Sequence, residues 1–449
     1  MVRVEVVSTE ELGDRSYMAH DGETALVIDP QRDIDRIEKL LSDLGLRCAL
    51  VAETHVHNDY VSGGLELARR HSAPYLVSAA EDVAFDRRGV ADGDELRAGR
   101  LHVKVVATPG HTDGHVAYVV DDGDGTEVVF TGGSLLFGSV GRTDLVDPQR
   151  TVELTRAQYR STRHLAVLLA DDVAVYPTHG FGSFCSSGST TADTDSTVGS
   201  ERTRNDALVI DNEDEFVAKL VAGLTAFPSY YAHMGPRNRQ GPGPVDFSTP
   251  EPTDATELRR RISGGQWVVD LRSRTAFAAE HLEGTIGIGL GQDFATYLGW
   301  LIPWEMPLTL IGENAEQISS AQRQLVRIGI DRPDGTAVGR PADLTVDGGL
   351  RHYPTATFVD LAREPGVVVL DVRRDDERRH GHIPRSAHIP LHSLLERIVD
   401  LPAGRLWVHC ASGYRASIAA SLLDRAGRDV VLIDDDFENA KDLLTDVAK

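Results

Sequence analysis

The stretch Thr54-His55-Val56-His57-Asn58-Asp59-Tyr60 follows a short apolar run at residues 49–52. That run predicts a β-strand, and the polar residues lie just beyond its end. In an extended segment, side chains two residues apart point to the same side, so His55, His57 and Asp59 can converge. Histidine and carboxylate groups are common ligands of zinc and iron. The stretch therefore predicts a metal site.

The composition is that of a globular protein with several domains. At 449 residues and 41% hydrophobic content, the chain is too long for one hydrophobic core and suggests roughly three domains. The 69 acidic and 46 basic residues give a net charge of -23, which argues against nucleic acid or an anionic membrane as a partner. No apolar run approaches the length of a membrane-spanning helix.

The cysteines and the first residues indicate the compartment. Cys48, Cys185 and Cys410 lie far apart and form neither a disulfide framework nor a CxxC motif, which suits a reducing environment. Residues 1–7 lack the long apolar core of a signal peptide. We therefore expect a cytoplasmic protein, and the sequence leaves a monomer and a homo-oligomer both open.

Three more polar motifs follow predicted strands within the first 180 residues. They are Thr-Pro-Gly-His-Thr-Asp-Gly-His at 108–115, Phe-Thr-Gly-Gly at 130–133 and Pro-Thr-His-Gly at 177–180. The apolar runs before them, such as Val-Lys-Val-Val-Ala at 103–107, predict the strands. Loops at rigid sheet edges are well placed for chemistry. We therefore expect His111 and His179 to lie near the first motif.

The ordered set HxHxD, TPGHT, FTG and PTHG resembles the metallo-β-lactamase fold, an α/β fold built as a four-layer αββα sandwich with its metals at one edge. Within that fold, Glu53-Thr54-His55, residues 60–64 and residues 140–144 resemble persulfide dioxygenases and their glyoxalase II-like relatives. This resemblance implies one Fe(II) bound by two histidines and one aspartate. The two histidines fall on His55 and His111.

Two positions depart from that family pattern. The resemblance places the aspartate ligand at Gly133, which offers no side-chain donor. Tyr60 stands where many relatives have a histidine that helps to bind a second metal. The missing aspartate would also be the bridging ligand of a dinuclear hydrolase. We expect Gly133→Asp to raise iron occupancy.

Three alternatives for the site stay open. His55, His57 and His111 can bind one Fe(II) or Zn(II) as a three-nitrogen site. Asp59 can instead move in as the carboxylate ligand. In the third alternative the site is poor in metal and the domain is a scaffold. His179 is a candidate ligand of a second site, and a structural histidine is the other reading.

Arg142 and Asp144 follow the Gly133 loop. An arginine is suited to binding a carboxylate, so Arg142 is a candidate for holding the charged end of a thiol substrate. A mutual salt bridge that supports the loop is the alternative.

The last 200 residues contain an internal repeat. Trp267-Val-Val-Asp-Leu-Arg, followed by His281, matches Val368-Val-Leu-Asp-Val-Arg, followed by His382. Each copy continues to a second apolar run, which ends at Gly312 in the first copy and precedes Cys410 in the second. Strands that alternate with helices indicate two small α/β domains with mainly parallel sheets.

Cys410-Ala-Ser-Gly-Tyr-Arg415 resembles the CxxGxR loop of rhodanese sulfurtransferases. A loop that enters a helix N-terminus points backbone N–H groups at the sulfur and stabilises Cys410 as a thiolate or persulfide. Arg415 adds positive charge for an anionic sulfur donor. In the first copy, Gly312-Glu-Asn-Ala-Glu has neither thiol nor arginine, so we expect an inactive domain there.

These observations predict a metal domain fused to two rhodanese-like domains, with the following boundaries: residues 1–234 for the metallo-β-lactamase-like domain, 235–252 for a linker, 253–340 for the inactive rhodanese-like domain and 350–449 for the active one. The predicted function is sulfide and persulfide metabolism. Cys410 and Arg415 would transfer sulfur among small thiols, glutathione persulfide, thiosulfate or sulfite. The alternatives are a zinc-dependent, glyoxalase II-like thioester hydrolase and a non-catalytic sulfur carrier.

Overall fold

The computed structural model describes residues 1–123, 125–188, 193–346 and 348–443. The predicted domain at 350–449 therefore ends in residues that lie outside the described ones. The chain divides into two compact units, the first of residues 1–245 with 326–330 and the second of residues 246–325 with those from 331 onward. Among the described residues, no helix combines the length and the apolar character needed to cross a membrane.

The first unit begins with a six-stranded sheet in the order β1-β2-β3-β4-β5-β6. Neighbours are antiparallel from β1 to β3 and parallel from β3 to β6. The strands are β1 (Arg3–Thr9), β2 (Asp14–His20), β3 (Thr24–Ile28), β4 (Arg47–Ala52), β5 (Tyr75–Ser78) and β6 (Arg88–Val90). The apolar run predicted as a strand at 49–52 is the end of β4.

A five-stranded sheet in the order β11-β10-β9-β8-β7 packs against the first. Its strands are β7 (Glu95–Ala98), β8 (Leu101–Ala107), β9 (Val116–Asp121), β10 (Glu127–Gly132) and β11 (Ala174–Pro177). Apolar side chains from both sheets form one buried core between them, with Tyr17 and Leu26 from one side and Tyr118 and Phe130 from the other.

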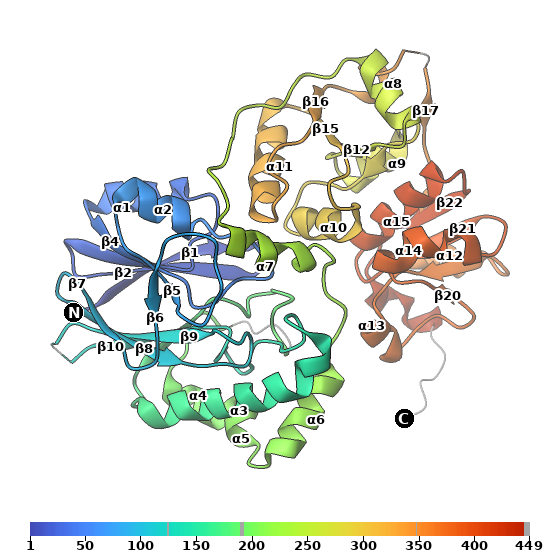
Figure 1. Cartoon of the computed structure of the whole chain (residues 1–449). Coiled ribbons are helices and arrows are strands. Elements are labelled where there is room, and N and C mark those ends of the chain that lie inside the picture. Colours follow the sequence, from blue (N-terminus) through green and yellow to red (C-terminus); the bar gives the residue numbers. More distant parts are fainter. Residues whose placement is uncertain (124, 189–192, 347, 444–449) are drawn as a thin grey trace. The chain divides into compact units, whose positions relative to one another are not determined.

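Helices cover the outer face of each sheet (Figure 1). Helices α1 (Asp35–Leu44) and α2 (Gly64–His71) pack on the first sheet. Helix α3 (Thr151–Leu168) packs on the second, beside α4 (Val198–Arg204), α5 (Asp206–Val209) and α6 (Glu213–Gly223). The order helix, sheet, sheet, helix confirms the predicted αββα sandwich.

Part of the predicted linker at 235–252 is helical. Helix α7 spans Tyr231–Gln240 and contains Pro236. A proline inside a helix removes one backbone hydrogen bond and usually predicts a break. The Asn238 side chain in α7 donates to the backbone oxygens of His57 and Tyr60, each at 2.9 Å. These tertiary contacts favour the helix despite Pro236.

The second unit contains two sheets whose paired strands are all parallel. The orders are β14-β12-β15-β16 and β18-β22-β21-β19-β20, so the first four strands match β20-β19-β21-β22. The bounds are β12 (Trp267–Asp270), β14 (Ile286–Gly287), β15 (Leu308–Gly312), β16 (Gly335–Val338), β18 (Thr355–Ala356), β19 (Val368–Asp371), β20 (Ala387–His388), β21 (Leu406–His409) and β22 (Val430–Ile433). A small antiparallel pair joins β13 (His281–Leu282) and β17 (Leu350–Arg351).

The helices of the second unit connect these strands. They are α8 (Ala255–Ser263), α9 (Arg274–Ala279), α10 (Phe294–Leu301), α11 (Ala315–Arg327), α12 (Phe358–Leu361), α13 (Asp375–Arg379), α14 (Leu394–Arg397) and α15 (Tyr414–Arg425). We refer to residues 253–340 as the first repeat and to residues 350–443 as the second repeat.

Both repeats hold a buried carboxylate at the end of the matching strand. In the first repeat, Arg272 donates to Asp270 from its backbone N–H and from Nε, each at 3.0 Å. In the second, Arg373 donates to Asp371 from the same two groups, again at 3.0 Å. The two repeats therefore share a buried Asp–Arg ion pair as well as a strand order.

Candidate functional site

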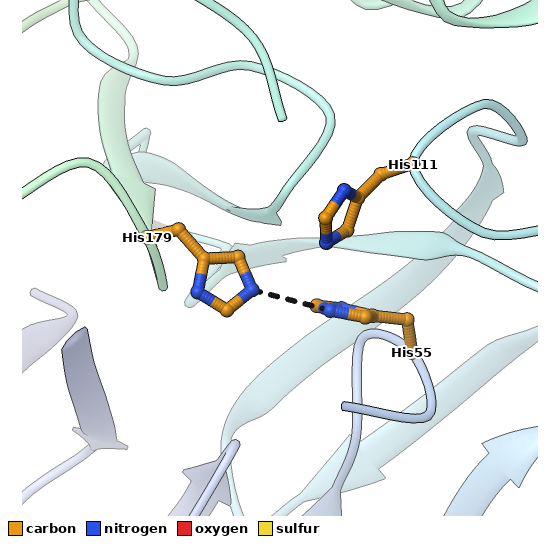
Figure 2. Close-up of side chains that lie close together, drawn as sticks. All are labelled: His55, His111 and His179. Carbon is orange, nitrogen blue, oxygen red and sulfur yellow. Dashed lines mark hydrogen bonds between the residues drawn. The ribbon is translucent and has the colours of Figure 1, made fainter. Parts of the chain in front are cut away.

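Three histidines from separate loops converge at one edge of the first unit (Figure 2). His55 follows β4, His111 lies between β8 and β9, and His179 follows β11. One ring nitrogen of each lies within 4.8 Å of the others. Their relative exposures are 1%, 0% and 0%. The structure thus brings together His55, His111 and His179.

The Nδ1 atom of His55 faces a hydroxyl that is already engaged as a donor. Thr54 donates its Oγ1 hydrogen to Asp29 at 2.7 Å. The same Oγ1 lies 2.9 Å from His55 Nδ1, so it accepts the hydrogen of that nitrogen. His55 Nε2 is consequently unprotonated and has a lone pair to offer.

The other two histidines are oriented by acceptors as well. His111 Nδ1 donates to the backbone oxygen of Arg142 at 2.6 Å. His179 Nδ1 lies 2.8 Å from an Asp14 carboxylate oxygen. Acceptors at Nδ1 fix the tautomer and leave Nε2 for a ligand bond. The Nε2 atoms of His55, His111 and His179 therefore all face the buried cluster.

These nitrogens fit a metal ion. Nε2 of His111 has no hydrogen-bond partner among the described residues. Nε2 of His55 and Nε2 of His179 lie 3.2 Å apart, although the Nδ1 atoms of both rings are already donors. Two lone pairs at this distance repel each other unless a cation or a proton lies between them. The donor set of three neutral imidazoles suits Zn(II) or Fe(II).

The electrostatics of the cluster favour two neutral rings. Burial lowers the pKa of His55 well below 6.5, and the neighbouring histidines add to this effect. Burial also lowers the pKa of His111 to about 3. Burial lowers the pKa of His179 too, but Asp59 and Asp14 raise it further, to about 10. A proton on His179 and a metal ion therefore compete for the same position.

The ring centroid of His57 lies 4.1 Å from that of His55, but one of its nitrogens faces carboxylates. Its Nε2 lies 3.1 Å from a Glu53 oxygen, 3.3 Å from an Asp29 oxygen and 3.0 Å from the Tyr60 hydroxyl. Burial lowers the pKa of His57, but Asp29 and Glu53 raise it to about 9. His57 is thus held by two buried carboxylates, and His179 takes the third place beside His55 and His111.

Asp59 contacts the nitrogen of His179 that faces away from the other two histidines of the cluster. One Asp59 carboxylate oxygen lies 3.2 Å from His179 Nδ1, on the side of the ring that faces away from His55. Ser183 also donates to this oxygen at 3.3 Å. Asp59 and Asp14 therefore orient His179 together.

The ring of His111 lies where a side chain at Gly133 would be. A Cβ atom at Gly133 would come within 2.4 Å of Cδ2 of His111. The backbone N–H of Gly133 donates to His115 Nε2 at 2.9 Å, which accounts for the second histidine of that motif. The Gly133→Asp substitution expected to restore a ligand therefore requires His111 to turn first.

Arg142 is fully engaged within the first unit. Its guanidinium donates to Asp144 at 2.7 Å and to the backbone oxygens of Phe184 and Thr225. The side chain is 2% exposed. The structure thus contains the salt bridge given as the alternative, and the Arg142 backbone oxygen orients His111.

Sequence reasoning missed Asn238, which closes the loop that contains His57. Besides its two bonds to backbone oxygens, Asn238 accepts from the backbone N–H of Ser62 at 2.9 Å. An asparagine inside a Gly- and Pro-rich stretch gives no motif, so only the position of α7 reveals this contact. The sequence therefore gives no sign that Asn238 positions the loop that contains His57.

The second unit contains the Cys410 loop. Cys410 follows β21 and is 1% exposed. Gly413 is the N-cap of α15, with φ of +89° and no side-chain cap bond. Arg415 donates to both carboxylate oxygens of Glu377, at 2.5 and 2.7 Å. The helix N-terminus is therefore not capped by a side chain, whereas the charge of Arg415 is already paired.

In the matching loop of the first repeat, side chains accept hydrogen bonds from backbone N–H groups. The Gln317 side chain accepts from the backbone N–H of Glu313 at 2.8 Å. Asn314 in turn accepts from the backbone N–H of Gln317 at 2.9 Å. Side chains thus take the N–H groups that a bound anion would need.

Comparison with known proteins agrees with this architecture. The metallo-beta-lactamase superfamily model matches residues 12–179, and the rhodanese-like domain model matches residues 355–442. The chain is 32% identical over 241 residues to the mitochondrial persulfide dioxygenase ETHE1 of Homo sapiens, covering 53% of this chain and 80% of that protein.

Two further similarities follow. A hydroxyacylglutathione hydrolase of Cupriavidus taiwanensis is 31% identical over 174 residues, covering 37% of this chain and 62% of that protein. The crystal structure of a metallo-beta-lactamase from Staphylococcus aureus superposes with a TM-score of 0.68 and 27% identity, covering 75% of this chain and 99% of that chain. The chain belongs to the metallo-β-lactamase superfamily, in the group of homologues that includes the persulfide dioxygenase ETHE1 and the hydroxyacylglutathione hydrolases, and it carries a rhodanese-like domain at residues 355–442.

Proposed function

We propose that this protein is an enzyme of sulfide and persulfide metabolism that joins a metal-dependent domain to a rhodanese sulfurtransferase. The observation that carries the first half is the convergence of three histidine Nε2 atoms in a buried cluster. His55, His111 and His179 would hold one metal ion. Fe(II) would supply oxygen chemistry at the sulfur of a persulfide such as glutathione persulfide, and Zn(II) would supply Lewis-acid chemistry for thioester hydrolysis.

The chain's own residues define the geometry of this site. Thr54, the Arg142 backbone oxygen and Asp14 each hold one Nδ1–H, so the three rings stay oriented toward one point. His57 is already shared by Asp29 and Glu53. Two further groups of possible ligands contain His57, one with Asp59 and His179 and one with Asp29 and Glu53. Because the carboxylates already pair with His57 and His179, the arrangement favours one metal at His55, His111 and His179.

Metal analysis of two variants tests the ligand set. We expect His179→Ala to lose bound metal, because His179 supplies one of three ligands, and His57→Gln to retain it. Circular dichroism would verify that both variants are folded. Loss of metal from His57→Gln with retention in His179→Ala would restore the set of His55, His57 and His111 instead.

Substrate assays then test the reaction. Anaerobically purified protein is expected to contain iron and to consume O₂ when glutathione persulfide is added. Hydrolysis of S-lactoylglutathione by a zinc form, without O₂ uptake, would favour the thioester hydrolase. Absence of metal after reconstitution would favour the alternative in which the protein is a non-catalytic sulfur carrier.

The second half of the proposal assigns Cys410 as the sulfurtransferase nucleophile, with Arg415 in its loop. Cys410 precedes a helix N-terminus that no side chain caps, which favours an anionic sulfur at that place. Mass spectrometry after exposure to a sulfur donor is expected to show one added sulfur on Cys410. An unmodified Cys410 with undiminished sulfur transfer would reject the assignment.

We also propose the domain organisation on the same grounds. Residues 253–340 would be a rhodanese-like domain without its cysteine, because strands β14-β12-β15-β16 have the order of β20-β19-β21-β22 and Gly312 stands in place of Cys410. The metal domain would extend beyond residue 234, since the compact first unit includes residues up to 245.

A further inference from the structure

Residues 326–330 lie within the sequence of the first repeat but belong to the compact first unit. They begin in the last turn of α11, which ends at Arg327. Val326 and Ile328 are fully buried, and Arg327 is 3% exposed. We call residues 326–330 the inserted segment. Because the segment is buried, its polar groups need partners within the protein.

The backbone of the inserted segment bonds to the loop at residues 57–62, which follows the first histidine of the cluster. The backbone N–H of Val61 donates to the backbone oxygen of Arg327 at 2.7 Å. Arg237 of α7 donates to the backbone oxygen of Gly329, also at 2.7 Å. Because α7 itself bonds to the same loop, the inserted segment, α7 and the loop support one another.

The side chain of Arg327 holds a second loop, which follows β3. Its Nη2 donates to Asp33 at 2.8 Å, and its Nη1 donates to Glu11 at 3.0 Å. Arg36 also donates to Asp33, at 3.0 Å. Burial raises the pKa of Asp33, but Arg327 and Arg36 lower it to below its ordinary value. Asp33 therefore stays ionised and forms a buried ion pair with Arg327.

The loop that contains Val61 supports His179. Asp59 lies two residues before Val61, and one of its carboxylate oxygens lies 3.2 Å from His179 Nδ1. All three side chains are buried. A displacement of Val61 would therefore turn the Asp59 carboxylate, and the orientation of the His179 ring would change with it.

The loop that contains Asp33 supports His55 in the same way. It begins with Asp29, which accepts hydrogen bonds from the backbone N–H and the hydroxyl of Thr54, each at 2.7 Å. The Thr54 hydroxyl in turn lies 2.9 Å from Nδ1 of His55. Arg327 thus joins the supports of two histidines of the cluster, one through its backbone oxygen and the other through its guanidinium.

We propose that Arg327 is a positioning residue for the histidine cluster and that the inserted segment makes the first repeat a component of the metal site. This inference rests on the proposed metal binding by His55, His111 and His179. Loss of a contact that orients a metal ligand directly costs about 10- to 100-fold in metal affinity. Arg327 acts through further residues on each side, so we expect a smaller factor. The cysteine-less repeat would then contribute to metal binding.

The test measures the Zn(II) affinity of the full chain by competition with a chelator, together with thermal unfolding of the metal-free protein. Arg327→Met should raise the Kd for Zn(II) about three- to tenfold. Asp33 keeps its bond from Arg36 in this variant, so the buried carboxylate retains a cationic partner. Arg327→Lys keeps a positive charge beside Asp33 and Glu11 and should raise the Kd less than Arg327→Met does.

Leu41→Ala is the matched control for a loss of stability. Leu41 is buried on α1, within the core between that helix and the first sheet, so its truncation removes packing and none of the hydrogen bonds described for Arg327. It should lower the melting temperature of the metal-free protein at least as much as Arg327→Met does. Its Kd for Zn(II) should stay within about twofold of the wild-type value.

A second variant decides the matter if Arg327→Met does not fold. Arg237→Met removes the bond to Gly329 from the α7 side and should raise the Kd about two- to fivefold. A lowered melting temperature with an unchanged Kd in the folded arginine variants would overturn the inference, and so would an equal rise of the Kd in Leu41→Ala. A wild-type chain that binds no Zn(II), or binding that His179→Ala leaves unchanged, would instead reject the proposed metal site.

Discussion

The two repeats of the second unit share a strand order and a buried Asp–Arg pair but differ in the loop after the matching strand. In the second repeat this loop contains Cys410 and enters a helix that no side chain caps. In the first, the side chains of Asn314 and Gln317 occupy backbone N–H groups of the loop. The first repeat thus keeps the sheet and the ion pair, but side chains occupy the N–H groups with which the start of its helix could bind an anion.

From this difference we expect that a cysteine alone would not make the first repeat active. A reactive sulfur needs both the thiol and N–H groups that are not already used. The two requirements can be changed separately by mutation, because they depend on different residues. The following predictions do so, from the largest effect to the smallest.

Removal of the thiol should have the largest effect. Cys410→Ser should reduce sulfur transfer by at least about 10³-fold, because the nucleophile is lost. Steady-state assay with a persulfide donor measures this. Cys185→Ser, a change at a buried cysteine of the first unit, is the matched control and should retain transfer. Comparable activity in Cys410→Ser would place the nucleophile elsewhere.

Breaking the shared ion pair should destabilise both repeats. Arg272→Met leaves the buried Asp270 carboxylate without its arginine and should lower the free energy of unfolding by about 3–5 kcal/mol. Arg373→Met should cost less, because Arg378 also donates to Asp371 at 3.2 Å. Denaturant unfolding measures the change. Arg397→Met removes an exposed pair with Asp400 and should cost less than about 1 kcal/mol. Equal losses of stability in Arg272→Met and Arg373→Met would show that Arg378 does not compensate for the loss of Arg373.

A substitution in the turn before α15 should reduce stability and sulfur transfer more than a substitution at the start of α11. Gly413 has φ of +89°, and a Cβ there would lie 2.3 Å from Oδ1 of Asp434. Gly413→Ala should cost about 1–2 kcal/mol for the left-handed backbone alone and should reduce sulfur transfer by roughly tenfold or more. The reverse change at the first residue of α11, Ala315→Gly, should cost no more than about 1 kcal/mol. Thermal unfolding combined with the transfer assay compares the two.

Adding the missing thiol should have the smallest effect. A Cβ at Gly312 would meet Ile318 Cδ1 at 3.1 Å and Gln317 Oε1 at 3.3 Å, both atoms of flexible side chains. Gly312→Cys should therefore change stability by no more than about 1 kcal/mol. In a Cys410→Ser background it should restore no sulfur transfer and gain no persulfide by mass spectrometry. Restored transfer would show that the closed loop is no obstacle.

Much of the fold could be predicted from local patterns. The apolar runs at 49–52 and 103–107 correspond to strands β4 and β8. These features depend on neighbouring residues in the chain. The αββα order and the rhodanese-like domain were likewise expected from motifs in sequence order.

The ligand geometry could not be predicted in the same way. Alternation along an extended segment placed His55 and His57 on one side, but the loop after β4 is irregular, and His57 faces carboxylates from two other segments. The orientation of His179 depends on Asp14, which is 165 residues away in the chain. Contacts of this range leave no periodic signal in the sequence.

The three hydrogen bonds made by Asn238 bear on where the metal domain can be cut. A protein that ends at residue 234 would lack Asn238 and leave three polar backbone groups, those of His57, Tyr60 and Ser62, without their partner. Each loss would cost about 1–3 kcal/mol in a buried site. A stable metal fragment should therefore include all of α7, so truncation at residue 245 is a better choice than truncation at 234, although it still removes residues 326–330 of the first unit.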